Sequence, residues 1–171
     1  KLRLNYPDGD IDALDNAFLD WAKQTAADYQ NEQGGSGVAV SLAASYDSFN
    51  VNARVVSLVA TASMNHSHSA LPATKTATFN ADRETGKLLV FKDLLKDGGE
   101  TAIRQLCADA GLDSTRTDLF DNWLLTAAGL RLYLDGEQPV EFTYAQLRGM
   151  LSIPKPPRTI DPSKPMIALT F

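Results

Sequence analysis

The sequence contains few residues of several types that define whole classes of protein. Cys107 is the only cysteine among the 171 residues, so no internal disulfide can form. Ile103, Leu106 and Ala110 accompany it at helical spacing, which favours a buried structural thiol over a reactive one. A chain without disulfides is compatible with the cytosol and with the outer surface of many bacteria, so cysteine usage leaves the location open.

Basic residues are too few for a nucleic-acid partner. The net charge is −5 and the pI is about 4.9, whereas a protein that binds phosphates presents a basic stripe. No apolar run approaches the roughly 18 residues that a membrane-spanning helix needs. We therefore expect no nucleic-acid partner and no membrane segment within this chain.

The chain has two histidines, His66 and His68, separated by one residue. Alternate residues of a strand point to the same face, so the two imidazoles could bind a metal ion. Two ligands leave such a site incomplete, and no Cys, Asp or Glu follows at ligand spacing. A polar loop with two solvated histidines fits the sequence better, and such a loop could also contact a partner.

Other functional patterns are incomplete. There is no Gly-x-Ser-x-Gly turn and no phosphate-binding loop, so we expect no catalytic residue, metal or cofactor in this chain. Trp21 and Trp123 fall on expected apolar faces and are predicted to be core residues rather than sugar-stacking platforms. Tyr133 and Tyr144 are, with the two histidines, the candidate residues for contact with a ligand or partner.

Hydrophobic periodicity predicts the first helix. Apolar residues recur every three or four positions from Ile11 to Tyr29, which indicates about five turns. Asp10 or Asp12 is the expected N-cap, and the glycines from Gly34 to Gly37 are expected to end the helical region. A second helix is expected at 100–110, with Gly111 in a left-handed C-terminal position.

Alternating apolar residues predict a series of strands. The expected strands lie at 38–46, 51–62, 74–80, 88–91, 123–126, 130–134 and 140–142. A hairpin turn is expected at 47–50, a short helical turn capped by Asp93 at 93–95, and a last short helix from Tyr144 to Leu151. Prolines at five positions make 153–165 an extended linker.

These elements together predict an α+β fold. A mostly antiparallel sheet packs against two main helices, and a short C-terminal helix and a proline-rich tail follow. The expected organisation is a domain at 1–152, the linker at 153–165, and a further strand at 166–171.

Short motifs occur in order along two stretches of the chain. Phe79 to Leu95 contains Phe-Asn-x-Asp, Thr-Gly-Lys and Asp-Leu-Leu, and Ala128 to Tyr133 reads Ala-Gly-Leu-Arg-Leu-Tyr. Val140 to Tyr144 follows as a closing strand. Over most of Asn5 to Leu151 these motifs resemble the extracellular domain of the RsiV and PdaC type. The resemblance implies a bacterial extracellular or cell-envelope domain.

One stretch departs from that family. Many members have Gly-Ala-His-Pro before the Phe-Asn strand, whereas this chain has Ser-Ala-Leu-Pro at 69–72, with Leu71 at the histidine position. Whatever that histidine does in relatives cannot be carried over. RsiV-like members sense lysozyme and PdaC-like members precede a deacetylase domain, so the resemblance allows either function.

The segment Lys164 to Phe171 favours the deacetylase. It is a short apolar stretch after a proline-rich linker, and it resembles the opening strand of the NodB-like polysaccharide deacetylases, which continue from Thr-Phe into Asp-Asp-Gly-Pro. In that family the first Asp is the general base and the second binds the metal. The resemblance implies an accessory module joined in cis to a C-terminal domain that uses a zinc-like divalent metal to deacetylate peptidoglycan.

The alternatives stay open from the sequence. Met166 to Phe171 could be a last strand of the same domain. The module itself could bind peptidoglycan, bind a lysozyme-like protein as an extracellular sensor, or act as a structural spacer. A spacer would lack both a cleft and an exposed aromatic or apolar patch. A signal or anchor segment upstream of Lys1 would suit an extracellular location.

We expect the reading frame of the parent gene to continue after Phe171 with Asp-Asp-Gly-Pro and, later, a His-x-x-x-His pair. Sequencing the gene checks this. A different continuation would remove the deacetylase interpretation and make binding to a muramidase the hypothesis to test.

Overall fold

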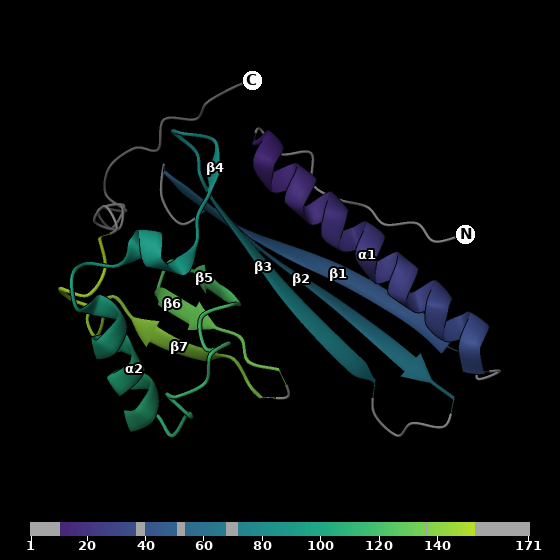
Figure 1. Ribbon diagram of the computed structural model, residues 1–171. Helices are drawn as coiled ribbons and strands as arrows, with labels where there is room; N and C mark the ends of the chain where they lie inside the picture. Colours follow the sequence, from purple (N-terminus) through teal and green to yellow (C-terminus); the bar gives the residue numbers. More distant parts are fainter. Residues whose placement is uncertain (1–10, 37–39, 51–53, 68–71, 136, 153–171) are drawn as a thin grey trace, which may run out of the picture.

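The computed structural model describes residues 11–36, 40–50, 54–67, 72–135 and 137–152 (Figure 1). Within them the chain forms two α-helices, a short 3-10 helix, and two antiparallel sheets of four and three strands. This architecture confirms the predicted α+β fold. The predicted linker at 153–165 and the strand at 166–171 lie outside the described residues.

Helix α1 spans Asp12–Ser36 and continues about two turns beyond Tyr29, where the apolar pattern ends. In the C-terminal half of α1, polar contacts replace apolar ones: Lys75 Nζ donates to Asp28 Oδ2 at 3.0 Å, and Gln33 Nε2 donates to Tyr29 Oη at 2.8 Å. The end of the helix at Ser36 confirms the prediction that the glycines from Gly34 to Gly37 end the helical region. The buried apolar residues at the N-terminal end and in the first half of α1 are Ile11, Leu14, Phe18 and Ala22.

The start of α1 differs from the prediction. The Ile11 carbonyl accepts the first helical hydrogen bonds, from the N–H groups of Leu14 and Asp15 at 2.9 and 3.1 Å. Asp12 is therefore the first helical residue and acts on the helix dipole within the first turn. The other predicted cap, Asp10, lies outside the described residues.

The larger sheet consists of four antiparallel strands in sequence order. Its strands are β1 (Val40–Asn50), β2 (Val55–His66), β3 (Ala73–Asp82) and β4 (Lys87–Leu88).

The hairpin turn predicted at 47–50 is wrong. Strand β1 keeps pairing with β2 through Asn50, which lies opposite Val56, and Asp47 lies opposite Val59. Asp47 is tolerated there because β1 is an edge strand, whose pairing uses backbone groups, and because the Asp47 side chain is exposed.

Strand β2 is buried on both faces. Leu58 and Ala60 face α1 and pack in one cluster with Phe18. Val55 faces the other way and belongs to the core of the smaller sheet. The four-stranded sheet is therefore a middle layer between α1 and the smaller sheet (Figure 1).

The smaller sheet and helix α2 enclose the second core. Phe91 and Leu94 of the 3-10 helix η1 (Phe91–Leu94) and Ile103 of α2 (Gly99–Asp109) are buried in it. Cys107 is fully buried in the same core, and burial raises the pKa of its thiol to about 11, which confirms the structural thiol. The strands are β5 (Trp123–Leu125), β6 (Gly129–Leu132) and β7 (Val140–Thr143).

Residues 144–150 form hydrogen-bonded turns in place of the predicted last helix. One bond of α-helical type joins the Leu147 N–H to the Thr143 carbonyl at 3.1 Å, and the next turn ends at Gly149, whose φ is +87°. A left-handed residue so early prevents a regular helix. Leu151 then forms an isolated antiparallel bridge with Leu95.

Gly129 has no room for a side chain, because a Cβ built on it would lie 1.8 Å from the Phe142 carbonyl oxygen across the β6–β7 pair. We expect Gly129→Ala to destabilise the fold by about 3 kcal/mol. Urea unfolding followed by circular dichroism measures this. Ala127→Ser, in the exposed turn beside it, is the control and should change stability by less than about 0.5 kcal/mol. Equal stability of the two variants would show that β7 can move away from Gly129.

Candidate functional site

A buried polar junction joins the two sheets. The Asn80 side chain of β3 lies at its centre and is only 3% exposed. Its Oδ1 accepts a hydrogen bond from Ser57 Oγ at 2.6 Å, and its Nδ2 donates to the Trp123 carbonyl of β5 at 2.8 Å. Both ends of the amide are thus satisfied, as a buried amide requires.

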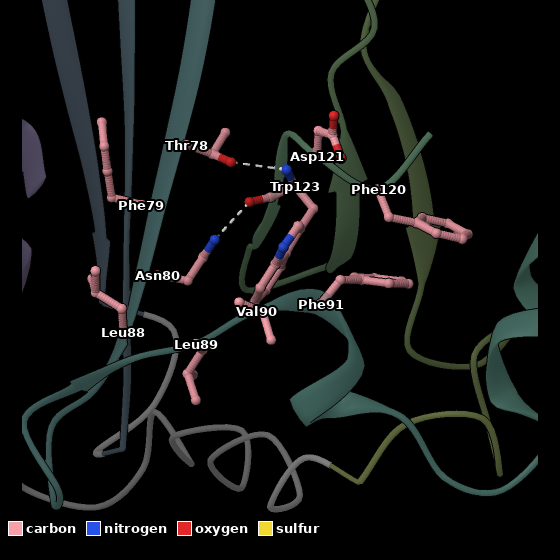
Figure 2. Close-up of a pocket in the computed structure, with 10 residues that line it drawn as sticks. All are labelled: Thr78, Phe79, Asn80, Leu88, Leu89, Val90, Phe91, Phe120, Asp121 and Trp123. Carbon is pink, nitrogen blue, oxygen red and sulfur yellow. Dashed lines mark hydrogen bonds between the residues drawn. The ribbon is translucent and has the colours of Figure 1, made fainter. Parts of the chain in front are cut away.

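Thr78 completes the junction two residues earlier on β3. The Trp123 N–H donates to Thr78 Oγ1 at 2.9 Å, and the Thr78 N–H donates to Asn122 Oδ1 at 3.2 Å. We call Ser57, Thr78, Asn80, Asn122 and Trp123 the polar junction. It fixes where β5 begins relative to β3, and Figure 2 shows its Thr78 and Asn80 bonds to Trp123.

A pocket of about 330 Å³ opens beside this junction. It lies between β3, the segment that leads from β4 into η1, and the residues that precede β5. The residues that line it are Thr78, Phe79, Asn80, Leu88, Leu89, Val90, Phe91, Phe120, Asp121 and Trp123 (Figure 2).

The rim of this pocket is apolar and faces solvent. Leu88 is 43% exposed and Val90 is 52% exposed, and they are the large hydrophobic residues that stand out as exposed in the described part of the chain. The segment is held in place, since the Leu89 N–H donates to the Asn80 carbonyl at 2.8 Å and the Val90 N–H donates to Asp93 Oδ2 at 2.9 Å. Asp93 thus caps the start of η1, close to its predicted role.

Aromatic rings form the opposite wall. Phe91 and Phe120 stack with centroids 4.2 Å apart and an interplanar angle of 15°. The Arg104 guanidinium lies 4.8 Å from the Phe120 centroid and donates to the Ser114 and Arg116 carbonyls. The wall is therefore supported from behind by a cation–π contact and two hydrogen bonds.

The chemistry that the pocket offers is apolar and aromatic surface beside one carboxylate. Thr78 Oγ1 and Asn80 Nδ2 are bonded to the Trp123 backbone, and Asn80 Oδ1 is bonded to Ser57 Oγ. Asp121 is exposed at the pocket, and no ion pair of its carboxylate occurs within the described residues. An apolar group with a neighbouring positive charge would match this lining.

The prediction that His66 lies in a polar loop is wrong. This residue is the last one of β2, and its Nε2 lies 2.5 Å from Glu32 Oε2 of α1. The contact forms because α1 lies along the sheet and brings the Glu32 carboxylate to the end of this strand. His68 lies outside the described residues. Among the residues that the structure describes, no group of three His, Cys, Asp or Glu side chains could hold a metal ion.

The two predicted tyrosines lie away from the pocket. Tyr144 Oη donates to the Thr126 carbonyl at 2.9 Å, and burial raises its pKa to about 12. Tyr133 interacts with Arg131, whose pKa is raised first by the hydrogen bond to Glu141 and then by that to Tyr133. In this arrangement Tyr144 supports the smaller sheet.

The two tryptophans have different environments. Trp123 is 3% exposed, which confirms its prediction as a core residue, and it also lines the pocket. Trp21 is partly buried, with its ring 5.6 Å from Phe18 and 6.5 Å from Phe79. The sequence did not reveal Leu88 and Val90 as site residues, because a short apolar run predicts a strand but not which of its residues stay exposed.

No helix in the described part of the chain is long and apolar enough to cross a membrane. The sequence matches no protein-family profile. No curated protein is similar to it at a significant level.

The solved structures that are similar to this chain include two DUF3298 family proteins. One is a DUF3298 family protein from Bacteroides fragilis, with 15% identity, a TM-score of 0.50, and coverage of 79% of this chain and 63% of that chain. The other is a DUF3298 family protein from Pseudomonas aeruginosa, with 18% identity, a TM-score of 0.48, and coverage of 74% and 68%. The likeness to the first of these proteins shows a similar fold alone, and the chain spans 63% of that protein.

Removing the Asn80 amide should weaken the polar junction. Asn80→Ala leaves the Trp123 carbonyl and the Ser57 hydroxyl without their partner in a buried place, and we expect a loss of about 1–3 kcal/mol in the free energy of unfolding. Urea unfolding monitored by tryptophan fluorescence measures it.

The matched control is Thr74→Ala on the exposed part of the same strand, which should change stability by less than about 0.5 kcal/mol. If Asn80→Ala were as stable as Thr74→Ala, the junction would not stabilise the contact between the sheets.

Proposed function

We propose that this chain is a non-catalytic binding module that accompanies a bacterial cell-wall polysaccharide N-deacetylase outside the cytoplasm. The pocket with its exposed rim at Leu88 and Val90 is the observation that carries the binding role. Exposed apolar groups around a concave site are typical of ligand and partner sites. A spacer without a ligand has no need of such a pocket, so the structure favours binding over the spacer.

The proposed link to a deacetylase rests on the sequence. Lys164 to Phe171 resembles the first strand of the NodB-like catalytic domain, and the motifs from Phe79 to Leu95 resemble the domain that precedes it in PdaC-like proteins. In the proposed arrangement the catalytic domain follows in cis and holds a zinc-like metal. That ion would polarise the acetamide carbonyl and activate water.

A binding module helps such an enzyme by raising the local concentration of its substrate. Peptidoglycan is an insoluble polymer, and a second attachment point makes each catalytic encounter intramolecular. The same benefit does not extend to a short soluble substrate, which leaves after each reaction. This difference separates binding from catalysis in an assay.

The test uses the protein with its downstream domain, compared with a variant that carries Leu88→Asp and Val90→Asp. Both side chains are exposed, so the changes should leave the fold intact. We expect acetate release from peptidoglycan sacculi to fall severalfold, and release from a soluble N-acetylglucosamine oligomer to stay unchanged.

Ala127→Asp, which adds a charge at an exposed turn residue that does not line the pocket, is the control and should behave as wild type. Equal activity of all three proteins on sacculi would contradict the binding role. A stable complex with a muramidase on size-exclusion chromatography, lost in the double variant, would instead support the sensor function that the RsiV resemblance implies.

A further inference from the structure

The outer edge of β3 is only partly covered. Strand β4 pairs with Ala81 and Asp82 alone, although β3 begins at Ala73. The sheet order places β3 between β2 and this short strand, so the N-terminal part of β3 is an edge in the described structure. Such an edge is a template for another strand.

The hydrogen bonds show which residues direct their backbone groups outward. The Asp82 carbonyl accepts from the Gly86 N–H, the Asn80 carbonyl accepts from the Leu89 N–H, and the Thr78 N–H donates to Asn122 Oδ1. These bonds recur at every second residue of β3 on the side away from β2. The N–H and C=O of one strand residue point to the same side, so Thr76 and Thr74 continue the outward series.

The outward groups of Thr74 and Thr76 have no backbone partner strand within the described residues. Thr74 is exposed and Thr76 is partly exposed. Together they present two N–H donors and two carbonyl acceptors in the pattern of an antiparallel ladder. This is the arrangement to which an extended peptide adds as a strand.

The pocket lies further along the same edge. It begins at Thr78 and reaches the exposed Leu88 and Val90, with Asp121 beside it. The Thr78 N–H is bonded to Asn122 Oδ1, so the ladder of a peptide that pairs with Thr74 and Thr76 ends before Thr78, and there the peptide meets an apolar hollow next to a carboxylate. The net charge of the chain is −5, which also favours a basic partner.

We infer that the β3 edge and the pocket together bind an extended basic peptide segment of a partner protein. The peptide adds a strand along Thr74 and Thr76, places a large apolar side chain between Leu88, Val90 and Phe120, and directs a Lys or Arg to Asp121. This inference rests on the proposed binding role of the pocket and does not need the deacetylase domain.

The outward N–H and C=O groups of Thr74 and Thr76 favour a peptide over other ligands, because they repeat at the spacing of a β-ladder. Glycans have no regular alternation of amide donors and carbonyl acceptors, so they cannot use the ladder positions of β3. A second copy of this chain could use them. It would bring two chains of net charge −5 together at one edge, which costs electrostatic free energy.

The test is selection of displayed random heptapeptides against the 171-residue chain, followed by titration calorimetry with the synthetic form of an enriched peptide. We expect enriched sequences to combine a large apolar residue with Lys or Arg. Amide exchange of Thr74 and Thr76 should slow on binding. No enrichment, or protection elsewhere in the chain, would overturn the inference.

Two variants of one position isolate the ladder. Thr76→Pro removes the outward N–H and should weaken the selected peptide about tenfold or more, whereas Thr76→Ala keeps the N–H and should bind within about twofold of wild type. If Thr76→Pro failed to fold, the Leu88→Asp and Val90→Asp protein would serve, with an expected loss of at least about tenfold.

Equal binding by the proline and alanine variants would overturn strand addition. A dimer on sedimentation that Thr76→Pro abolishes, without peptide binding, would show that the edge pairs two copies instead. Suppose that the chain binds the peptide but the Leu88→Asp and Val90→Asp protein is as active on sacculi as wild type. This result would retain the inference and reject the proposed function. Loss of activity on sacculi in the double variant, without any peptide binding to the wild-type chain, would overturn the inference and assign the pocket to glycan.

Discussion

The burial of polar side chains between two sheets is the constraint on which this structure depends. Strand β2 is covered on both faces, so Ser57 and its neighbour Asn80 on β3 have no access to water. A buried amide without partners is costly. Here Ser57 Oγ and the Trp123 carbonyl satisfy the Asn80 amide, and the bond to Trp123 ties β5 to β3. The smaller sheet thus owes its position to hydrogen-bond geometry as much as to apolar burial.

The pocket follows from the same constraint. The junction holds Trp123 against β3 at Thr78 and Asn80, while the backbone bond from Leu89 to Asn80 holds the segment after β4. The space between these two attachments is not filled by side chains. Leu88 and Val90 consequently border a hollow whose walls are fixed by bonds elsewhere, and a ligand would meet a largely prepared surface.

The sequence predicted the elements whose side chains follow a simple period. The first half of α1, the buried Cys107 in α2, and the core position of Trp123 belong to this group. The predictions were wrong at 47–50, where polar residues on an edge strand resemble a turn, and at 144–150, where apolar spacing suggests a helix but the chain forms turns and Gly149 is left-handed.

The candidate site was beyond sequence reasoning for a different reason. Its residues come from β3, from the segment after β4, and from the residues before β5, and only the tertiary contacts bring them together. The histidines and tyrosines attracted attention because their chemistry is conspicuous. In the structure His66 and Tyr144 instead make contacts within the fold, to Glu32 and to the Thr126 carbonyl.

The attachment of α1 changes character along its length. Its first half is fastened by buried side chains such as Leu14 and Phe18, whereas further along Asp28 meets Lys75 in a contact that is open to water. Exposed ion pairs are screened by dissolved ions, whereas buried apolar contacts do not depend on attraction between charges. The contact of Asp28 with Lys75 therefore weakens as ionic strength rises, while the buried contacts of Leu14 and Phe18 remain. An increase in salt concentration would loosen α1 at its C-terminal part first.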